Sequence, residues 1–231
     1  MDDLQHGVAE AFRLLVTGDP ELYQIIARTL AISTVATALA MLAGIPLGYG
    51  LARGRFPGRT VLLSAVNTGM GVPPVVVGLV VWLLLSRSGP FGSLGLIYTK
   101  QAMVLAQFVI ATPLVVGFTA ASVQSLPVEL PDLLYTLGAG RLRRLWIVAG
   151  EAQLGLLAAI MAGFGAVISE VGASMTVGGN LRGSTRVLTT AIVTETGRGN
   201  LPVALALGLL LLALAFVVNA LLTIVQQRQR S

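Results

Sequence analysis

The chain has 231 residues, of which 55% are hydrophobic and only 11% charged, whereas about a quarter of the residues in an average soluble domain are charged; the composition therefore indicates an integral membrane protein. With no cysteine and a single histidine, His6, the chain lacks the means for disulfides, thiolate chemistry or a Cys/His metal cage. The net charge of +5 is not a sign of nucleic-acid binding, because the arginines lie in short loops beside apolar spans, where membrane topology explains them.

The first predicted elements are an outer segment and a long membrane span. Residues 1–22 are acidic and weakly amphipathic, and Asp19-Pro20-Glu21 predicts a helix start at their end. The span covers about residues 23–51 and is uncharged from Thr29 onward, which is long enough to cross a bilayer. Its Gly44 and Gly48 form a small-residue pair that indicates either a close helix contact or merely common spacing.

The second span, about residues 60–86, contains a double proline. Gly69 and Gly71 precede Pro73 and Pro74, and two missing backbone donors predict a helix break within the membrane. Such a break is tolerated where other protein or a water-filled path satisfies the freed carbonyl groups. The break is therefore either a plain kink or part of a helix that lines a pathway.

Three further spans complete a single transmembrane domain over residues 1–231. They are expected at about 101–124, 154–177 and 201–225. The fourth carries Ser169 and Glu170, and a segment rich in glycine and hydroxyl side chains follows it, up to about residue 200. An all-α bundle of five helices results.

The charges of the loops predict the orientation of these spans. With the N-terminus outside and the C-terminus inside, the cytoplasmic segments hold eight arginines and three acidic residues, whereas the outer segments hold seven basic and six acidic residues. This asymmetry follows the positive-inside rule and predicts a multi-pass protein of the cytoplasmic (inner) membrane.

Residues 126–151 form the longest cytoplasmic loop and are predicted to contain two short amphipathic helices. Leu133, Leu134 and Leu137 share the spacing of one helix face, and Gly138 can end that helix. A basic helix that starts with Arg141 follows. By pattern alone, this is an interfacial loop of a polytopic protein.

The loop resembles the coupling loop of ABC-importer permeases. In that family a glutamate, two alanines and a glycine are followed by an isoleucine and a Leu-Pro pair. Here Asp132 takes the glutamate position, Leu133 and Leu134 the alanines, Gly138 the glycine and Val148 the isoleucine, while Gly150-Glu151 replaces Leu-Pro. The resemblance implies a type I importer fold in which Asp132, Leu133, Leu134, Leu137, Gly138 and Arg141 serve coupling to the ATPase.

Three other stretches resemble oxyanion permeases. Residues 72–78 (VPPVVVG), 105–116 (LAQFVIATPLVV) and 169–192 (SEVGASMTVGGNLRGSTRVLTTAI) are similar to segments of the molybdate and sulfate permeases, and the last is most similar to the tungstate permeases. The resemblance implies a homodimer with two cytoplasmic ABC ATPase subunits, which hold ATP and Mg, and an extracytoplasmic oxyanion-binding protein. The implied function is import of tungstate by alternating access, with molybdate or sulfate as alternatives.

No residue pattern predicts catalysis or a cofactor within this chain. The only lysine, Lys100, follows Thr99 with no P-loop glycines before it, so the energy must come from a partner or from an ion gradient. A proton-coupled secondary carrier that uses Glu170 is one alternative, and a purely structural membrane subunit is another. An intramembrane enzyme or a metal site would need groups that the spans lack.

The expected translocation path combines the broken second span with the fourth span. A tetrahedral dianion needs donors that replace its hydration, such as hydroxyl groups and backbone N–H groups. The path residues expected from this chemistry are Pro73, Pro74, Ser169, Glu170, Ser174, Thr176, Asn180 and Thr185. Arg182 and Arg186 at its outer end could attract an anion, although hydroxyl residues also merely pack helices and arginines also face headgroups.

Overall fold

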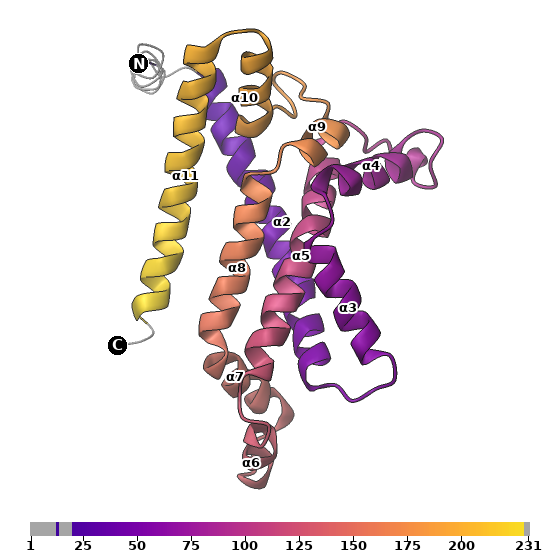
Figure 1. Ribbon diagram of the computed structural model, residues 1–231, viewed down its shortest axis with the longest axis vertical. Coiled ribbons are helices and arrows are strands. Elements are labelled where there is room, and N and C mark those ends of the chain that lie inside the picture. The colour runs from indigo at the N-terminus through magenta and orange to yellow at the C-terminus, as the bar shows by residue number, and fades with distance from the viewer. Residues whose placement is uncertain (1–12, 14–19, 229–231) are drawn as a thin grey trace.

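The computed structural model describes residue 13 and residues 20–228. Within these residues the chain is helical, with no strand. Figure 1 shows a long bundle with short helices at both ends. The elements are α2 (Pro20–Arg53), α3 (Arg59–Met70), α4 (Pro74–Leu85), η1 (Gly92–Leu94), α5 (Lys100–Gln124), α6 (Leu130–Thr136), α7 (Arg141–Glu151), α8 (Gln153–Ile168), α9 (Gly172–Gly178), α10 (Leu188–Gly197) and α11 (Leu201–Arg228).

The centre of the bundle is the crossing of α2 and α5. A Cβ atom on Gly44 would lie 2.8 Å from Val115 Cγ1, and one on Gly48 would lie 2.6 Å from the carbonyl oxygen of Val116. The two glycines therefore let the backbones approach closely, as small residues do between membrane helices. Of the two interpretations of this pair, the close contact is confirmed.

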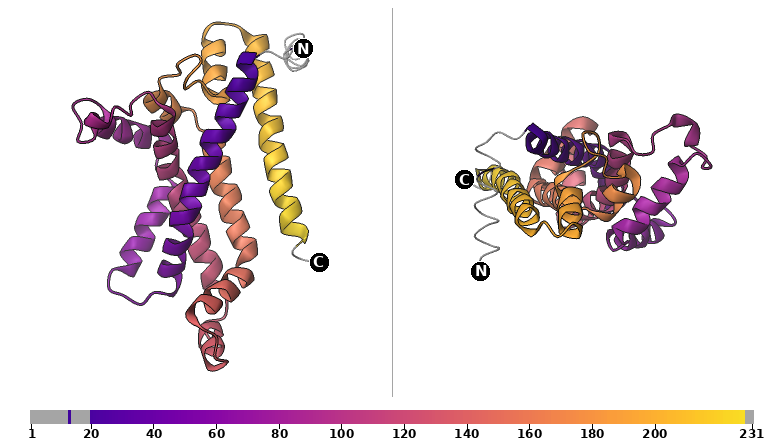
Figure 2. Two further views of the ribbon diagram at one scale, coloured as in Figure 1. Left: turned by 180° about the vertical axis from the view of Figure 1, so that it is seen from behind. Right: turned by 90° about the horizontal axis from the view of Figure 1, so that it is seen from above.

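The double proline breaks the second span, as predicted. α3 ends at Met70, α4 begins at Pro74, and their axes differ by 103°. α4 projects sideways from the bundle (Figures 1 and 2) and packs on α9, where Gly78 lies so close to Ala173 that a Cβ would be 2.6 Å from its Cα.

The fourth span differs from the prediction. The expected helix over residues 154–177 ends at Ile168, and α9 starts separately at Gly172. The Glu170 side chain accepts a hydrogen bond from the Ala173 N–H at 2.9 Å, and this local bond supplies a new helix start in place of a continuous ladder. At its other end α8 is preceded by α7, from which it is bent by 73°.

By length and composition, the described helices include three that could cross a membrane, or up to five if each bent pair counts as one span. α2, α5 and α11 are long and apolar enough to cross a membrane by themselves, and the bent pairs α3–α4 and α7–α8 each qualify together. The described part of α2 begins at Pro20, and the predicted cap Asp19 and most of the outer segment 1–22 lie outside the described residues.

Candidate functional site

Four of the predicted path residues meet at the break of the second span. Pro73, Pro74, Ser169 and Glu170 line one cavity of about 370 Å³, together with aliphatic side chains of α5. Glu170 is the only ionisable residue in this lining. The cavity is thus a mainly apolar space at the point where two helices end and leave backbone groups outside regular helix.

Glu170 has a structural partner in this arrangement. Its side chain is buried and binds the Ala173 N–H, while its carbonyl oxygen accepts a 2.9 Å hydrogen bond from Thr189 Oγ1. The residue therefore joins the start of α9 to α10. This agrees with a capping role and gives no support to the alternative of a proton carrier.

The other four predicted path residues lie apart from the cavity lining. Each has one polar atom in a hydrogen bond inside the subunit, whereas the buried Oδ1 of Asn180 has no partner. Ser174 accepts from Gln107 Nε2 at 3.1 Å, and Thr176 Oγ1 donates to the Gly172 carbonyl at 2.8 Å. Asn180 Nδ2 donates to Thr194 Oγ1 at 2.6 Å, and Thr185 Oγ1 donates to the Gly178 carbonyl. The bonds of Asn180 and Thr185 hold the turn between α9 and α10, whereas the bond of Thr176 lies within α9 and that of Ser174 joins α9 to α5. The hydroxyl groups of Thr176 and Thr185 thus donate within the subunit, and a role of these four residues in a path stays a prediction.

The outer arginines are also engaged. Arg182 forms a two-point ion pair with Glu21, at the start of α2, with Nε 2.7 Å from Oε1. Arg186 Nη1 lies 3.9 Å from the same carboxylate. Because Glu21 neutralises part of this charge, attraction of an anion by Arg182 and Arg186 is weaker than the sequence suggested.

Part of this cavity could not be predicted from the amino-acid sequence. Val109, Ile110 and Leu114 of α5 line the cavity, but plain aliphatic residues in a membrane helix carry no mark of function. Pro113, which lies in the same part of α5, packs against the end of α3 next to the break. A Cβ atom on Gly69 would lie 3.0 Å from the Cγ atom of Pro113. A proline inside a helix beside a broken span was the one available hint.

The loop at the opposite end of the bundle forms the second candidate site. α6 and α7 are joined at Gly138, which has φ +76 and therefore adopts the left-handed conformation. The turn is closed by hydrogen bonds from Gly138 N to Tyr135 O at 2.9 Å and from Ala139 N to Leu134 O at 3.0 Å. The predicted pair of helices with a glycine between them is confirmed.

The predicted apolar face of α6 is only partly available. Leu133 and Leu137 are 56% and 73% exposed, whereas Leu134 is 9% exposed and packs in a small core with Val123, Val148 and Ala152. Leu134 therefore belongs to the interior of the loop and not to its surface. The side chains of Asp132 and Arg141 lie outside the described residues.

A cation–π contact further joins the two helices. The Arg144 guanidinium carbon lies 5.2 Å from the centre of the Tyr135 ring, a distance typical of such contacts. With the small core beneath it, the loop presents Leu133, Leu137 and Trp146 on a folded surface. Within the described residues no group of acidic or histidine side chains could hold a metal ion.

The comparison with known families identifies the fold as that of a transport permease. The chain belongs to the family of binding-protein-dependent transport system inner membrane components, which matches residues 44–231. It is therefore a multi-pass protein of the inner membrane and the permease subunit of an ABC importer.

Relatives with named substrates place it in the oxyanion group. The chain is 39% identical to the tungstate uptake system permease protein TupB of Peptoclostridium acidaminophilum, over 98% of this chain and 100% of that protein. It is 32% identical to TupB of Campylobacter jejuni (95% and 92% covered), and 43% identical to a permease of Haloferax volcanii that is named for an anion ABC transporter (87% and 88%). The molybdenum permease ModB of Escherichia coli is more distant, at 29% identity (78% and 82%).

Solved structures show the same fold. An inward-facing structure of the MetNI methionine ABC transporter matches with a TM-score of 0.73 over 91% of this chain and 97% of the matched chain, at 19% identity. At this identity the likeness concerns the fold alone. It confirms the predicted type I importer architecture.

Proposed function

We propose that this chain is the translocating subunit of an ATP-driven tungstate importer. The observation that carries the proposal is the 39% identity to a tungstate permease along the full length of both chains. The more distant molybdenum permease, at 29% identity, keeps molybdate as the competing substrate, and sulfate shares its tetrahedral shape. The expected order is tungstate before molybdate and sulfate.

The apolar surface of the loop supports coupling to an ATPase. Leu133 and Leu137 are exposed on α6, which lies at the extreme end of the bundle (Figure 1). A short helix with two or three exposed apolar residues is suited to a groove on a partner. In the proposed assembly two copies of this chain bind two cytoplasmic ABC ATPases, which hold ATP and Mg, and an extracytoplasmic binding protein delivers the oxyanion.

The cavity beside Pro73 and Pro74 supports a pathway at the break of the second span. No arginine or lysine lines it, so an anion would not be trapped there by a fixed charge. In the proposed mechanism two copies of α3, α4 and α8 enclose the path and alternate between outward and inward access. The N-terminus then lies outside and the C-terminus inside, as the loop charges favour.

Transport by the reconstituted complex tests this function. Proteoliposomes that contain the permease and its ATPase are supplied with the binding protein on the outside. They should accumulate tungstate only when ATP is present on the side of the membrane where the ATPase is bound. Molybdate and sulfate are measured in parallel as separate arms. Tungstate uptake that is independent of ATP but driven by a proton gradient would contradict the importer, and preferential sulfate or molybdate uptake would correct the substrate.

A further inference from the structure

A second cavity, of about 440 Å³, lies at the end of the bundle that carries the coupling loop. The end of α2, the start of α3 and the end of α5 form its walls. Three arginines line it, Arg53, Arg55 and Arg59, with Tyr49 and Gln124 as neutral polar neighbours. No acidic side chain belongs to the lining.

Two of these arginines are held in place by backbone carbonyl groups. Arg59 Nε donates to Leu51 O at 2.6 Å and its Nη2 donates to Ala52 O at 3.2 Å, at the end of α2. Arg53 Nη2 donates to Pro127 O at 3.2 Å. A guanidinium has five N–H groups, so both side chains keep further donors after these bonds; the buried Nε of Arg53 has no partner.

Within the described part of the chain, no carboxylate lies within ion-pair distance of the three arginines. None of the three arginines forms an ion pair there, and Arg55 makes no hydrogen bond either. Three like charges around one cavity repel one another, and an anion between them would relieve this repulsion. Arginine is also the residue whose planar fork matches phosphate oxygens.

We propose that this arginine cavity is a binding site for a phosphate-type anion, most suitably the headgroup phosphate of an anionic phospholipid. The chain beside the lining arginines favours a lipid: Phe56 follows Arg55, Val61 and Leu62 follow Arg59 by two and three residues, and the three side chains are 42%, 70% and 49% exposed. A bound lipid can cover such side chains with its acyl chains while its phosphate meets the arginines.

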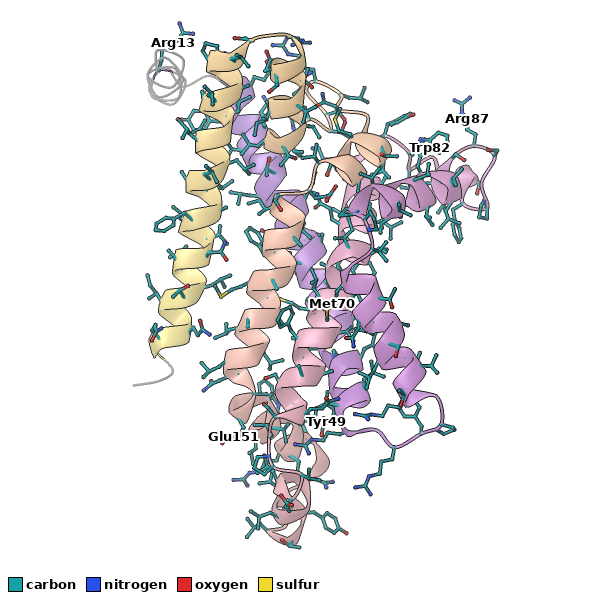
Figure 3. All side chains as sticks on the ribbon, viewed as in Figure 1. Arg13, Tyr49, Met70, Trp82, Arg87 and Glu151 are labelled. Atoms are coloured by element: carbon teal, nitrogen blue, oxygen red, sulfur yellow. The ribbon has the colours of Figure 1, made fainter. Side chains whose placement is uncertain are left out.

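The loop that carries Arg55 has a backbone suited to a fixed site. A Cβ on Gly54 would lie 2.4 Å from the carbonyl oxygen of Gly50, and Gly58 has φ +86. Gly54 allows the close approach to α2 and Gly58 the positive φ, so both permit the tight course of this loop next to the cavity. Tyr49 lies at this end of α2 in Figure 3, whereas Arg87 lies at the tip of the α4 projection, far from it.

The test is lipid retention by the full-length chain in nanodiscs that contain phosphatidylcholine with a minor share of phosphatidylglycerol. Native mass spectrometry counts the bound phosphatidylglycerol for the wild type, for Arg55→Gln and for Arg53→Gln. Arg87→Gln removes the same charge from a remote exposed position and is the matched control. We expect each cavity variant to lose phosphatidylglycerol roughly fivefold, the effect of one arginine at an anionic surface.

A second measurement separates the sources of the anion and guards against misfolding. In discs of phosphatidylcholine alone, calorimetry with inorganic phosphate and with tungstate should show no binding at the cavity if the ligand is a lipid. Binding of either ion that Arg55→Gln abolishes would assign the same site to a free anion. Arg55→Lys, which keeps the charge, should retain part of the binding. Equal lipid retention in all variants, with no binding of either ion, would overturn the proposal.

Discussion

Gly48 of α2 and Thr119 of α5 are in such close contact that a Cβ on the glycine would lie 2.7 Å from the threonine Cβ. The Cβ atom added to Gly48 would also lie 2.6 Å from the carbonyl oxygen of Val116. Backbone atoms cannot yield as a flexible side chain does. The distance between the two central helices therefore depends on the absence of one methyl group.

Gly48→Ala should separate these helices and lower the free energy of unfolding by about 1–3 kcal/mol, the usual effect of overpacking. Thermal denaturation of the purified protein in detergent measures it. Gly50→Ala is the control, because a Cβ there meets nothing within 4 Å and alanine favours a helix. An unchanged midpoint for Gly48→Ala would show that the helices can shift without loss.

The two classes of leucine on α6 should respond differently to truncation. Leu133→Ala and Leu137→Ala remove exposed side chains and should reduce co-purification of the ATPase while leaving the melting temperature unchanged. Leu134→Ala should destabilise the loop by about 2–5 kcal/mol, because it leaves a cavity in its core. If all three variants bound the ATPase as the wild type does, the proposed docking surface would be wrong.

Gly138→Asp should leave the permease in the membrane but abolish substrate-stimulated ATP hydrolysis by the complex. At φ +76 a residue with a Cβ is strained by roughly 1–2 kcal/mol, and the exit of the chain from α6 changes. Gly140→Asp serves as control, since its φ is −63 and aspartate is favoured before a helix. Normal stimulation with Gly138→Asp would remove this loop from the coupling role.

Replacement of Pro73 and Pro74 together by alanine should reduce tungstate uptake more than membrane insertion. The two N–H groups regained favour a more regular helix, which would straighten the 103° bend and alter the cavity. Uptake is compared at equal expression in membrane fractions. Pro46→Ala, a proline within α2, controls for loss of a proline; equal uptake by both variants would mean that the break is only a kink.

Glu170→Gln separates a capping role from proton transfer. The amide keeps an oxygen that can accept from Ala173 N, so uptake should remain within about threefold of the wild type. Glu170→Leu, which has no acceptor, should lower both stability and uptake. Complete loss of uptake in the glutamine variant, at normal stability, would instead favour a proton carrier.

Much of the helical framework could be predicted from the sequence, because it depends on local properties. The long apolar runs of α2, α5 and α11 contain no double breaker, and the lone prolines Pro46 and Pro113 stay inside continuous helices. Two adjacent prolines interrupt the second span. At Gly138 the expected residue type is found where the backbone needs a positive φ.

The missed features depend on contacts between distant residues. α8 ends at Ile168 although no proline follows it. The Glu170 side chain accepts a hydrogen bond from the Ala173 N–H of α9, and the Glu170 carbonyl oxygen accepts one from the Thr189 hydroxyl group. Ser174, one of the hydroxyl groups expected in a path, accepts a hydrogen bond from Gln107, which lies 67 residues away in the chain. Sequence spacing names these polar side chains but does not reveal how the folded chain uses them.

The small core around Leu134 determines how a displacement of α6 reaches the membrane. Its members come from the end of α5 (Val123), from α6 and α7 (Leu134 and Val148) and from the start of α8 (Ala152). Ser122 also donates a hydrogen bond to the Ala152 carbonyl at 3.2 Å. Because close-packed side chains transmit strain, we expect a displacement of α6 to move the adjoining ends of α5 and α8 together and not to be absorbed by bending at Gly138.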